Sequence, residues 1–222
     1  NSTDVLCFGT ATGTATLQIT GGTIPYAIVW DDASAQTTIT ASNLTIGTYS
    51  ASVTDALGCV ANTSVTINEP SQLAAAISAT TNASCYGICD GSADVIANSG
   101  TGPYTYAWTN GDATSTASNL CAGSHQVIVT DANGCNVTVN TSITEPDELI
   151  MTLSSTDASC GLATGSASVS ISNGSSPYVY SWNDPSNQST STASNLLEAW
   201  HTVTVTDADG CSNSDSVFVQ NV

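Results

Sequence analysis

Apolar and polar residues alternate with a period of two along most of the chain. Tyr104, Tyr106 and Trp108 fall on one face of such a stretch, and Val203 and Val205 fall on one face of another. This alternation is typical of half-buried β-strands, and no stretch shows a convincing helical period. Turn-forming residues recur about every ten positions, at Gly21-Gly22, Asp31-Asp32, Asn110-Gly111-Asp112, Asn133-Gly134 and Asp209-Gly210. The pattern predicts an all-β protein built of antiparallel β-sandwiches.

The same motif recurs three times at a constant interval. Thr-Asp-Ala-x-Gly-Cys ends at Cys59, Cys135 and Cys211, and 135 − 59 and 211 − 135 both equal 76. Ala-Ser-Asn-Leu recurs at the same interval, beginning at residues 41, 117 and 193. Self-similarity of this kind indicates a tandem array, so the chain repeats one module three times. Repetition favours a stalk, adhesin or fibre over an enzyme, because each added copy adds reach and binding valency.

Two Glu-Pro pairs mark the expected boundaries between the three copies. They are Glu69-Pro70 and Glu145-Pro146, and they divide the chain into copies at residues 1–70, 71–146 and 147–222. A proline at these points interrupts strand pairing. Only six residues precede Cys7 in the first copy, so we expect its first strand to be missing or donated from elsewhere.

Charge excludes several classes of function. The chain has no Lys or Arg against 18 Asp and Glu, which gives a formal net charge of -18 at pH 7. Phosphate contacts need cations, so nucleic acid is excluded as a partner. Schiff-base chemistry and bidentate anion clamps are excluded as well, since they need lysine and arginine. No apolar stretch approaches the roughly 18 residues of a membrane helix, so we expect no membrane insertion.

Eight cysteines predict a disulfide framework. Each copy has one cysteine near its start (Cys7, Cys85, Cys160) and one at the end of the Thr-Asp-Ala-x-Gly-Cys motif (Cys59, Cys135, Cys211). We expect these two to pair within each copy, where closing a loop of about 50 residues contributes roughly 4 kcal/mol to stability. Alignment of the copies then pairs Cys89 with Cys121. A four-cysteine zinc site in the second copy is the alternative, but it leaves the other copies unexplained. Paired cysteines imply an oxidising extracellular compartment.

The second copy carries the fullest set of motifs. It reads Cys85-Tyr86-Gly87, Gly91-Ser92-Ala93, Pro103-Tyr104-Thr105-Tyr106-Ala107-Trp108, Leu120-Cys121-Ala122-Gly123 and Val129-Thr130-Asp131-Ala132-Asn133-Gly134-Cys135. These strings resemble the SprB repeat family of surface adhesins, and the resemblance covers essentially the whole chain. It implies immunoglobulin-like repeats of a secreted bacterial cell-surface protein, exported by the type IX pathway, that contact the substratum or form filaments. Copies one and three depart from it by lacking the second cysteine pair.

Aromatic residues supply the next candidates. Trp30, Trp108 and Trp182 each end a Pro-Tyr strand, and we expect them in the core, stacked on a disulfide between the sheets; a sugar-binding platform is the alternative. Trp200 stands where the other copies have Thr48 and Ser124. We consider it either an exposed contact residue between modules or subunits or a local cap over sheet edges.

Polar residues at equivalent positions have structural explanations as well. His125 and His201 occupy the position of Tyr49, which predicts a corner residue bonded to the backbone. Asp55, Asp131 and Asp207 precede a glycine expected at positive φ, and each closes an Asx turn there. The alternative is a structural calcium site at these aspartates, with Asp209 or a boundary glutamate as further ligands. No other cofactor is expected.

These observations predict a non-catalytic protein, since no copy gathers a nucleophile, a base and an orienting acid. We expect disulfide-stapled, immunoglobulin-like β-sandwich repeats of an extracellular adhesin or stalk, active in adhesion and gliding-type motility. Its partner would be an extracellular surface or glycan, bound through many weak contacts. One alternative is a filament of copies of the chain completed by strand donation. Another is an accessory carbohydrate-binding module.

Overall fold

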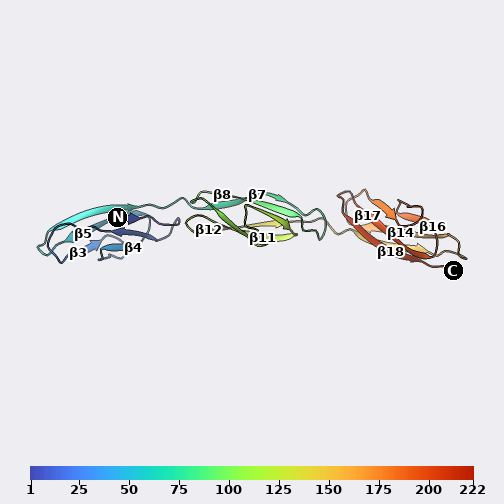
Figure 1. Ribbon diagram of the computed structural model, residues 1–222, viewed down its shortest axis with the longest axis horizontal. Coiled ribbons are helices and arrows are strands. Elements are labelled where there is room, and N and C mark those ends of the chain that lie inside the picture. The colour runs from blue at the N-terminus through green and yellow to red at the C-terminus, as the bar shows by residue number, and fades with distance from the viewer. The chain divides into compact units, whose positions relative to one another are not determined.

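The computed structural model describes residues 1–222 and consists of β-strands joined by turns and loops (Figure 1). The strands of the first copy are β1 (Ser2–Thr3), β2 (Gly13–Thr16), β3 (Ala27–Trp30), β4 (Thr40–Leu44), β5 (Gly47–Thr54) and β6 (Val60–Ile67). Those of the second are β7 (Ala74–Thr81), β8 (Gly91–Asn98), β9 (Thr105–Trp108), β10 (Thr116–Leu120), β11 (Gly123–Thr130) and β12 (Asn136–Ile143). Those of the third are β13 (Ile150–Thr156), β14 (Gly165–Ser172), β15 (Val179–Trp182), β16 (Thr192–Leu196), β17 (Ala199–Thr206) and β18 (Ser212–Val219).

The strands of each copy form two three-stranded sheets with one topology. The sheets are β1-β2-β4 and β3-β5-β6 in the first copy, β7-β8-β10 and β9-β11-β12 in the second, and β13-β14-β16 and β15-β17-β18 in the third. The first, second and fourth strands of a copy thus form one sheet, and the third, fifth and sixth form the other. This is the A-B-E and C-F-G arrangement of an immunoglobulin-type sandwich without its D strand. Neighbouring strands pair antiparallel, as in β13 with β14 and β17 with β18.

Alternating residues of both sheets build one core in the third copy. Val169 on β14 and Leu196 on β16 pack in one cluster with Trp182 on β15 and Val203 on β17. The first copy has the equivalent cluster, including Trp30, Ala41, Leu44 and Ile67. Burial from both sheets into a single layer defines a β-sandwich. The predicted fold class, tandem immunoglobulin-like antiparallel sandwiches, is therefore confirmed.

The recurrent Ala-Ser-Asn-Leu motif forms a bulge in the fourth strand of each copy. In the third copy Ala193 and Leu196 are both buried although they are three residues apart, a spacing that would face them oppositely in a regular strand. Asn195 between them has φ +57°, a left-handed conformation that asparagine tolerates. The register of β14 against β16 shifts at this place. The asparagine thus inserts one residue and turns both apolar side chains into the core.

The first copy does have a first strand, contrary to the expectation that it is missing. Ser2 and Thr3 form β1, and they pair with Ala15 and Thr14 of β2. The strand has two residues, whereas β13 of the third copy has seven. It forms because the backbone of Asn1 continues the pairing: Thr16 N–H donates to the Asn1 carbonyl at 2.7 Å.

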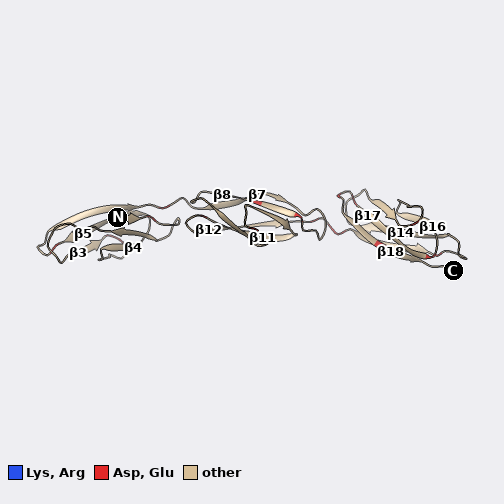
Figure 2. Ribbon diagram, viewed as in Figure 1, with Lys and Arg blue, Asp and Glu red and all other residues tan.

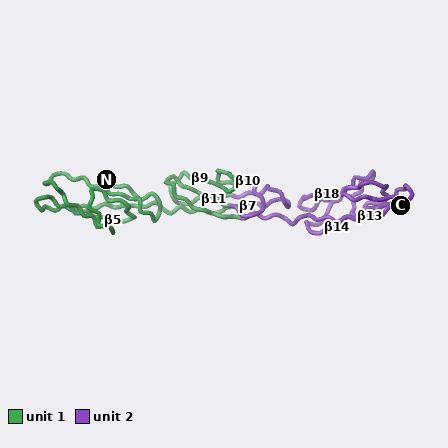
Figure 3. Tube along the Cα trace, turned by 90° about the horizontal axis from the view of Figure 1, so that it is seen from below, with its two compact units in different colours: residues 1–79, 94–117, 126–141 green, residues 80–93, 118–125, 142–222 purple.

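The chain divides into two compact units (Figure 3). Unit 1 comprises residues 1–79, 94–117 and 126–141 and contains both sheets of the first copy. Unit 2 comprises residues 80–93, 118–125 and 142–222 and contains both sheets of the third copy. The strands of the second copy are divided between the units. Copy boundaries at residues 70 and 146 therefore stay a prediction.

The chain carries Asp and Glu but no Lys or Arg, so Figure 2 contains red segments and no blue ones. No helix of the structure is long and apolar enough to cross a membrane.

Candidate functional site

The first cysteine of each copy lies in a tight loop between its first two strands, which we call the start loop (residues 7–10, 85–88 and 159–162). In the first two copies, Thr10 N–H donates to the Cys7 carbonyl and Ile88 N–H to the Cys85 carbonyl, both at 3.1 Å. The glycine inside the loop, Gly9 or Gly87, has φ +72°, which closes the turn without strain.

A boundary glutamate fastens each of these two start loops to the end of its copy. Gly9 N–H donates to Glu69 Oε2 at 2.9 Å, and Gly87 N–H donates to Glu145 Oε2 at 2.7 Å. In the third copy Asn221 Oδ1 accepts from Gly161 N–H at 2.9 Å. The sequence marked Glu69 and Glu145 as boundary residues and, alternatively, as calcium ligands. Their role depends on a contact across about 60 residues, for which the sequence carries no local signal.

The second cysteine of each copy ends a turn held by one aspartate, which we call the aspartate turn (residues 55–59, 131–135 and 207–211). Asp131 Oδ1 accepts from the Asn133 and Cys135 N–H groups at 2.9 and 3.0 Å, and its Oδ2 accepts from Thr101 N–H at 3.1 Å. Asp55 and Asp207 hold Cys59 and Cys211 in the same way, each at 2.9 Å. The predicted Asx turn is confirmed, including a positive φ at Gly58, Gly134 and Gly210.

These backbone bonds also set the ionisation of the aspartates. The N–H groups of Cys59 and Thr23 lower the pKa of Asp55. The N–H group of Ser175 lowers the pKa of Asp207, with further bonds from the rest of its turn. Burial raises the pKa of Asp131, but the N–H groups of Thr101, Cys135 and Asn133 outweigh it and the net shift is downward. The carboxylates therefore stay charged well into the acid range.

Among the proposed calcium ligands, Asp207 and Asp209 share one turn, and the calcium site stays a prediction. Asp55, Asp131 and Asp207 each lie in a different aspartate turn, where backbone N–H groups occupy both carboxylate oxygens. No group of three or more His, Cys, Asp or Glu side chains is arranged to hold a metal ion. Since calcium needs six to eight oxygens, the structure offers no further support for this prediction.

The disulfides join successive copies, and the prediction of pairing within copies is wrong for them. Cys7 of the first copy bonds to Cys135 of the second, with a Cα–Cα distance of 5.7 Å, inside unit 1. Cys85 of the second copy bonds to Cys211 of the third, with a Cα–Cα distance of 5.5 Å, inside unit 2. In both joints a start loop meets the aspartate turn of the next copy along the chain.

Strand length explains why a start loop cannot reach the aspartate turn of its own copy. Val5 N–H donates to the Asn68 carbonyl at 3.0 Å, so the Cys7 loop lies at the end of β6. Cys59 lies immediately before the first residue of the same strand. The eight residues of β6 span roughly 26 Å, whereas a disulfide needs Cα atoms within about 7 Å. The third copy repeats this arrangement, with β18 between Cys211 and the Cys160 loop.

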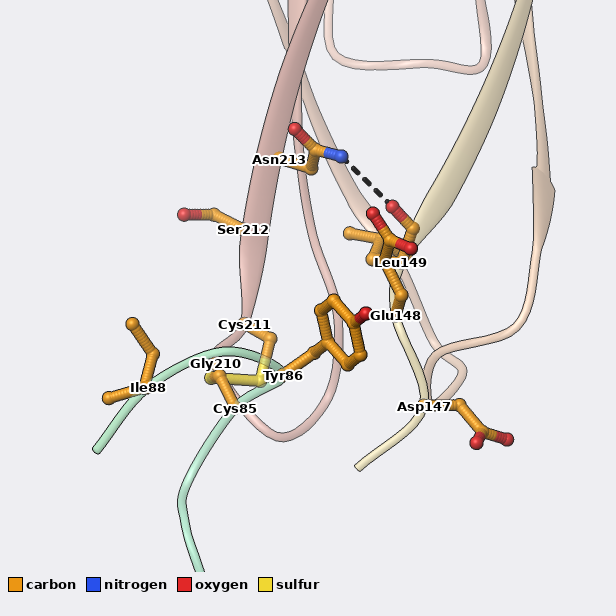
Figure 4. Close-up of a pocket in the computed structure, with 10 residues that line it drawn as sticks. All are labelled: Cys85, Tyr86, Ile88, Asp147, Glu148, Leu149, Gly210, Cys211, Ser212 and Asn213. Atoms are coloured by element: carbon orange, nitrogen blue, oxygen red, sulfur yellow. Dashed lines mark hydrogen bonds between the residues drawn. A yellow bond between two sulfur atoms is a disulfide. The ribbon is translucent and has the colours of Figure 1, made fainter. Parts of the chain in front are cut away.

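The joint in unit 2 encloses a hollow of about 370 Å³ beside the Cys85–Cys211 bond (Figure 4). Tyr86 extends from the start loop toward Glu148 and Leu149, and Asn213 Nδ2 donates to the Leu149 carbonyl at 3.0 Å. The joint in unit 1 has a similar hollow of about 340 Å³, with Phe8 in place of the tyrosine. A direct bond closes that joint further, since Asn133 Nδ2 donates to the Leu6 carbonyl at 3.0 Å.

The remaining cysteines differ from one another. Cys89 bonds to Cys121, the pair that alignment of the copies favours. Cys59 and Cys160 have no partner and are exposed. The predicted bridges Cys7–Cys59, Cys85–Cys135 and Cys160–Cys211 are all absent.

The three predicted core tryptophans are buried, but not against a disulfide. Trp30, Trp108 and Trp182 have exposed fractions of 2%, 5% and 2%. Each indole N–H donates to a backbone carbonyl, that of Thr38, Thr114 or Thr190, at 2.9 to 3.0 Å. No disulfide joins the two sheets in the first or third copy, so the expected stacking partner is replaced by this hydrogen bond.

Trp200 lies at the surface of the third copy, with 64% of its area exposed. Its ring is 5.4 Å from that of Phe218. It also lines a hollow of about 440 Å³ together with Asn183, Asp184 and Glu198. Asp184 is fixed there by hydrogen bonds from the backbone of Ser186 and Gln188 at 3.0 and 2.8 Å. An exposed aromatic ring beside fixed polar groups suits contact with a partially apolar partner.

The histidines have the corner role that their positions predict. His125 Nε2 bonds to the Cys121 carbonyl at 2.9 Å and His201 Nε2 to the Leu197 carbonyl at 3.0 Å. Tyr49 OH, at the same position in the first copy, donates to the Thr45 carbonyl at 3.2 Å. In all three the acceptor lies four residues earlier.

The model of the SprB repeat matches the chain three times, at residues 1–35, 77–113 and 152–187. One match falls in each copy and includes its start loop and its core tryptophan. The predicted resemblance to the SprB repeat is therefore confirmed, with one match in each copy. No curated protein matches the chain.

Several solved structures of adhesion proteins are similar at a low level. The N-terminal eight Ig domains of Down Syndrome Cell Adhesion Molecule are 13% identical, with a TM-score of 0.36, over 88% of this chain and 33% of that one. The extracellular domain of Protocadherin GammaB4 is 12% identical, with a TM-score of 0.32, over 88% of this chain and 41% of that one. The chain thus spans less than half the length of either relative. Likeness at these scores carries no information on function.

Proposed function

We propose that the chain is a non-catalytic repeat region of a secreted bacterial cell-surface adhesin or stalk, acting in attachment and gliding-type movement. The observation that carries this proposal is the threefold match to the SprB repeat. The disulfide joints support it, because covalent ties between successive repeats suit a protein that holds a load. Many weak contacts on such an array add up to firm attachment.

Beads coated with the full chain test the adhesive role. We expect them to stay on glass and on polysaccharide-coated surfaces under flow better than beads coated with albumin. Removing both joints, by Cys7→Ser with Cys135→Ser and Cys85→Ser with Cys211→Ser, should lower retention. Cys89→Ser with Cys121→Ser is the comparison variant, since it removes a bridge within one copy and leaves both joints intact. Equal retention of wild-type and albumin beads on every surface would contradict the adhesive role.

We infer that the partner is an extracellular surface or glycan, and that the Trp200 hollow is one contact point. Aromatic faces stack on the apolar faces of sugars and hydrogen-bonding groups beside them give orientation. Trp200→Ala should lower retention on polysaccharide and leave retention on bare glass unchanged. Equal retention of Trp200→Ala and wild type on polysaccharide would argue against this contact.

A self-assembling filament completed by strand donation is the second candidate, and one observation favours it. Because β1 has two residues, a hollow of about 250 Å³ remains beside β2, lined by Asn1, Ala15, Thr16, Trp30 and Val65, among others. A donated strand would fill it. We expect a peptide of residues 147–156, which contains all of β13, to raise the melting temperature of the chain. An unchanged melting temperature, with no fibres in electron micrographs, would dismiss this candidate.

A further inference from the structure

Cys59 and Cys160 are the two unpaired members of a regular bonding pattern. In both joints the start-loop cysteine of one copy bonds to the aspartate-turn cysteine of the copy that follows. Cys59 is an aspartate-turn cysteine and Cys160 is a start-loop cysteine. The two roles are complementary, and the structure pairs neither cysteine.

The turn around Cys59 already has the conformation that its bonded counterparts have. Asp55 Oδ1 accepts from Cys59 N–H at 2.9 Å, as Asp131 Oδ1 accepts from Cys135 N–H at 3.0 Å. The preceding glycines have φ +83° and +84°. The thiol of Cys59 is exposed, whereas Cys211 in the same place is buried against its joint. No rearrangement of the turn is needed to form a bond.

Apolar residues surround Cys59 where the bonded turns carry polar ones. Leu57 is 76% exposed and Val60 is 60% exposed. Their counterparts are Asn133 and Asn136 in the second copy, and Asp209 and Ser212 in the third. A hollow of about 150 Å³ beside Cys59 is lined by Ile19, Tyr26 and Val60. Two large apolar side chains at the surface on either side of a free thiol indicate a face that another repeat covers.

The loop around Cys160 is also closed by a turn bond, from Leu162 N–H to the Ser159 carbonyl at 2.9 Å, so Cys160 is the second residue of its turn where Cys7 and Cys85 are the first. The connection between β13 and β14 is one residue shorter than that between β7 and β8. Ala158 N–H donates to the Gln220 carbonyl at 2.7 Å, the bond that Ala83 N–H makes with Thr144 in the second copy. Cys160 itself has φ +52° and is followed directly by Gly161 at φ +72°, whereas Gly9 and Gly87 lie two residues after their cysteines. Leu162, which follows Gly161, is 62% exposed.

We propose that Cys59 and Cys160 each form a disulfide with another SprB repeat, so that the joint seen twice in this chain continues in both directions. The shared chemistry is a complementary repeat cysteine, and between two copies of this chain the bond is Cys160–Cys59. Oxidised glutathione is a sufficient oxidant. One thiolate attacks it and releases glutathione, and the second thiolate displaces a second glutathione, so two protein thiols become one disulfide. This proposal rests on the bonding pattern and not on the adhesive role.

Two single variants of the full chain test the pairing. Cys59→Ser keeps only the Cys160 thiol, and Cys160→Ser keeps only the Cys59 thiol; a mass tag on one distinguishes them. Both sites are exposed, so neither variant disturbs the core. Mixed in a glutathione redox buffer, they should give the mixed dimer in well over the twofold excess that random pairing yields. The wild type should give a series of covalent oligomers, and the double variant should stay monomeric.

Two results would overturn the proposal. One is mixed and like dimers in random proportion, and the other is a wild type that stays monomeric at every glutathione ratio. Protein isolated from its native surface distinguishes the sources of the partner. A Cys59 peptide bonded to a Cys160 peptide identifies a second copy of this chain, and one bonded to a different repeat sequence identifies a longer array. A native Cys59 that is free, or bonded to glutathione or Cys7, would contradict both.

Discussion

Two tryptophans of one copy have opposite roles at the residue scale. Trp182 is buried and bonded through its indole N–H, while Trp200 is exposed and touches Phe218. Trp182→Ala should lower the free energy of unfolding by about 3–5 kcal/mol, because it leaves a cavity and an unpaired carbonyl. Trp200→Ala should change it by less than about 1 kcal/mol. Urea unfolding followed by circular dichroism measures both, and equal losses would contradict the assignment.

The aspartate turns make the stability of the fold depend on pH. The folded state lowers the pKa of Asp207 below that of an unfolded aspartate, about 3.9. Its contribution to stability is therefore complete above that value and is lost as the pH falls through the folded-state pKa. Asp207→Asn should lower the urea midpoint at pH 7, and the difference from wild type should shrink as the pH falls below the unfolded-state pKa of about 3.9. Asp157→Asn removes the same charge at an exposed site and should change little. A difference that persists undiminished in acid would contradict the role of the charged form.

The sequence predicted the residue-scale features that depend on local contacts. The corner bonds of His125 and His201, the positive φ of Gly134 and the burial of Trp108 all follow from spacing within one turn or strand. The fastening of the start loops by Glu69 and Glu145 was not predictable in this way. It joins residues about 60 positions apart, and a glutamate beside a proline carries no sign of such a partner.

Glycine at the start of the second strand of each copy sets the packing at the scale of elements. A Cβ at Gly91 would lie 2.7 Å from Ile143 Cγ2 and 2.9 Å from the Leu120 carbonyl oxygen. Gly91→Ala should therefore cost about 1–3 kcal/mol through overpacking. Gly102→Ala is the matched control, because its nearest neighbour would be Tyr104 at 3.9 Å. The residues equivalent to Gly102 in the first and third copies, Ile24 and Ser176, already carry a Cβ. Equal melting temperatures of the two variants would contradict the close approach.

Strand identity was predictable from alternation, whereas the bulges and the bridges were not. Ala193 and Leu196 are three residues apart, so a period of two cannot place both in the core. Both are buried because Asn195 between them takes a left-handed conformation, which inserts one residue into the strand. The prediction of disulfides within copies was wrong because it rested on the number of cysteines in each copy. It took no account of the length of the strand that separates them. An eight-residue strand after Cys59 already separates it from the other end of its copy by roughly 26 Å.

At the scale of the whole molecule, the disulfides shorten the covalent path between the chain ends. The path runs from Asn1 to Cys7, across to Cys135, back to Cys121, across to Cys89, back to Cys85, across to Cys211 and on to Val222. It contains roughly 40 residues, or about 135 Å of extended chain, against about 770 Å for the reduced chain. A load applied to the ends therefore acts directly only on β1, β11 and β18, and all other strands lie off the loaded path while the bridges last.

Single-molecule stretching checks this path. The oxidised chain should reach its limit at about 135 Å plus the bridges, and Cys89→Ser with Cys121→Ser should lengthen it by about 110 Å. Under pairing within copies the Cys89–Cys121 bridge would lie off the path. An unchanged length in this variant would then contradict the joints.

A disulfide map of the unreduced protein tests the central claim most directly. Pepsin suits the digestion, since the chain has no Lys or Arg for trypsin. Mass spectrometry should recover Cys7 linked to Cys135 and Cys85 linked to Cys211, which shows that successive repeats are covalently joined. Recovery of Cys7 with Cys59, Cys85 with Cys135 and Cys160 with Cys211 would show that each repeat closes on itself, and would contradict the account.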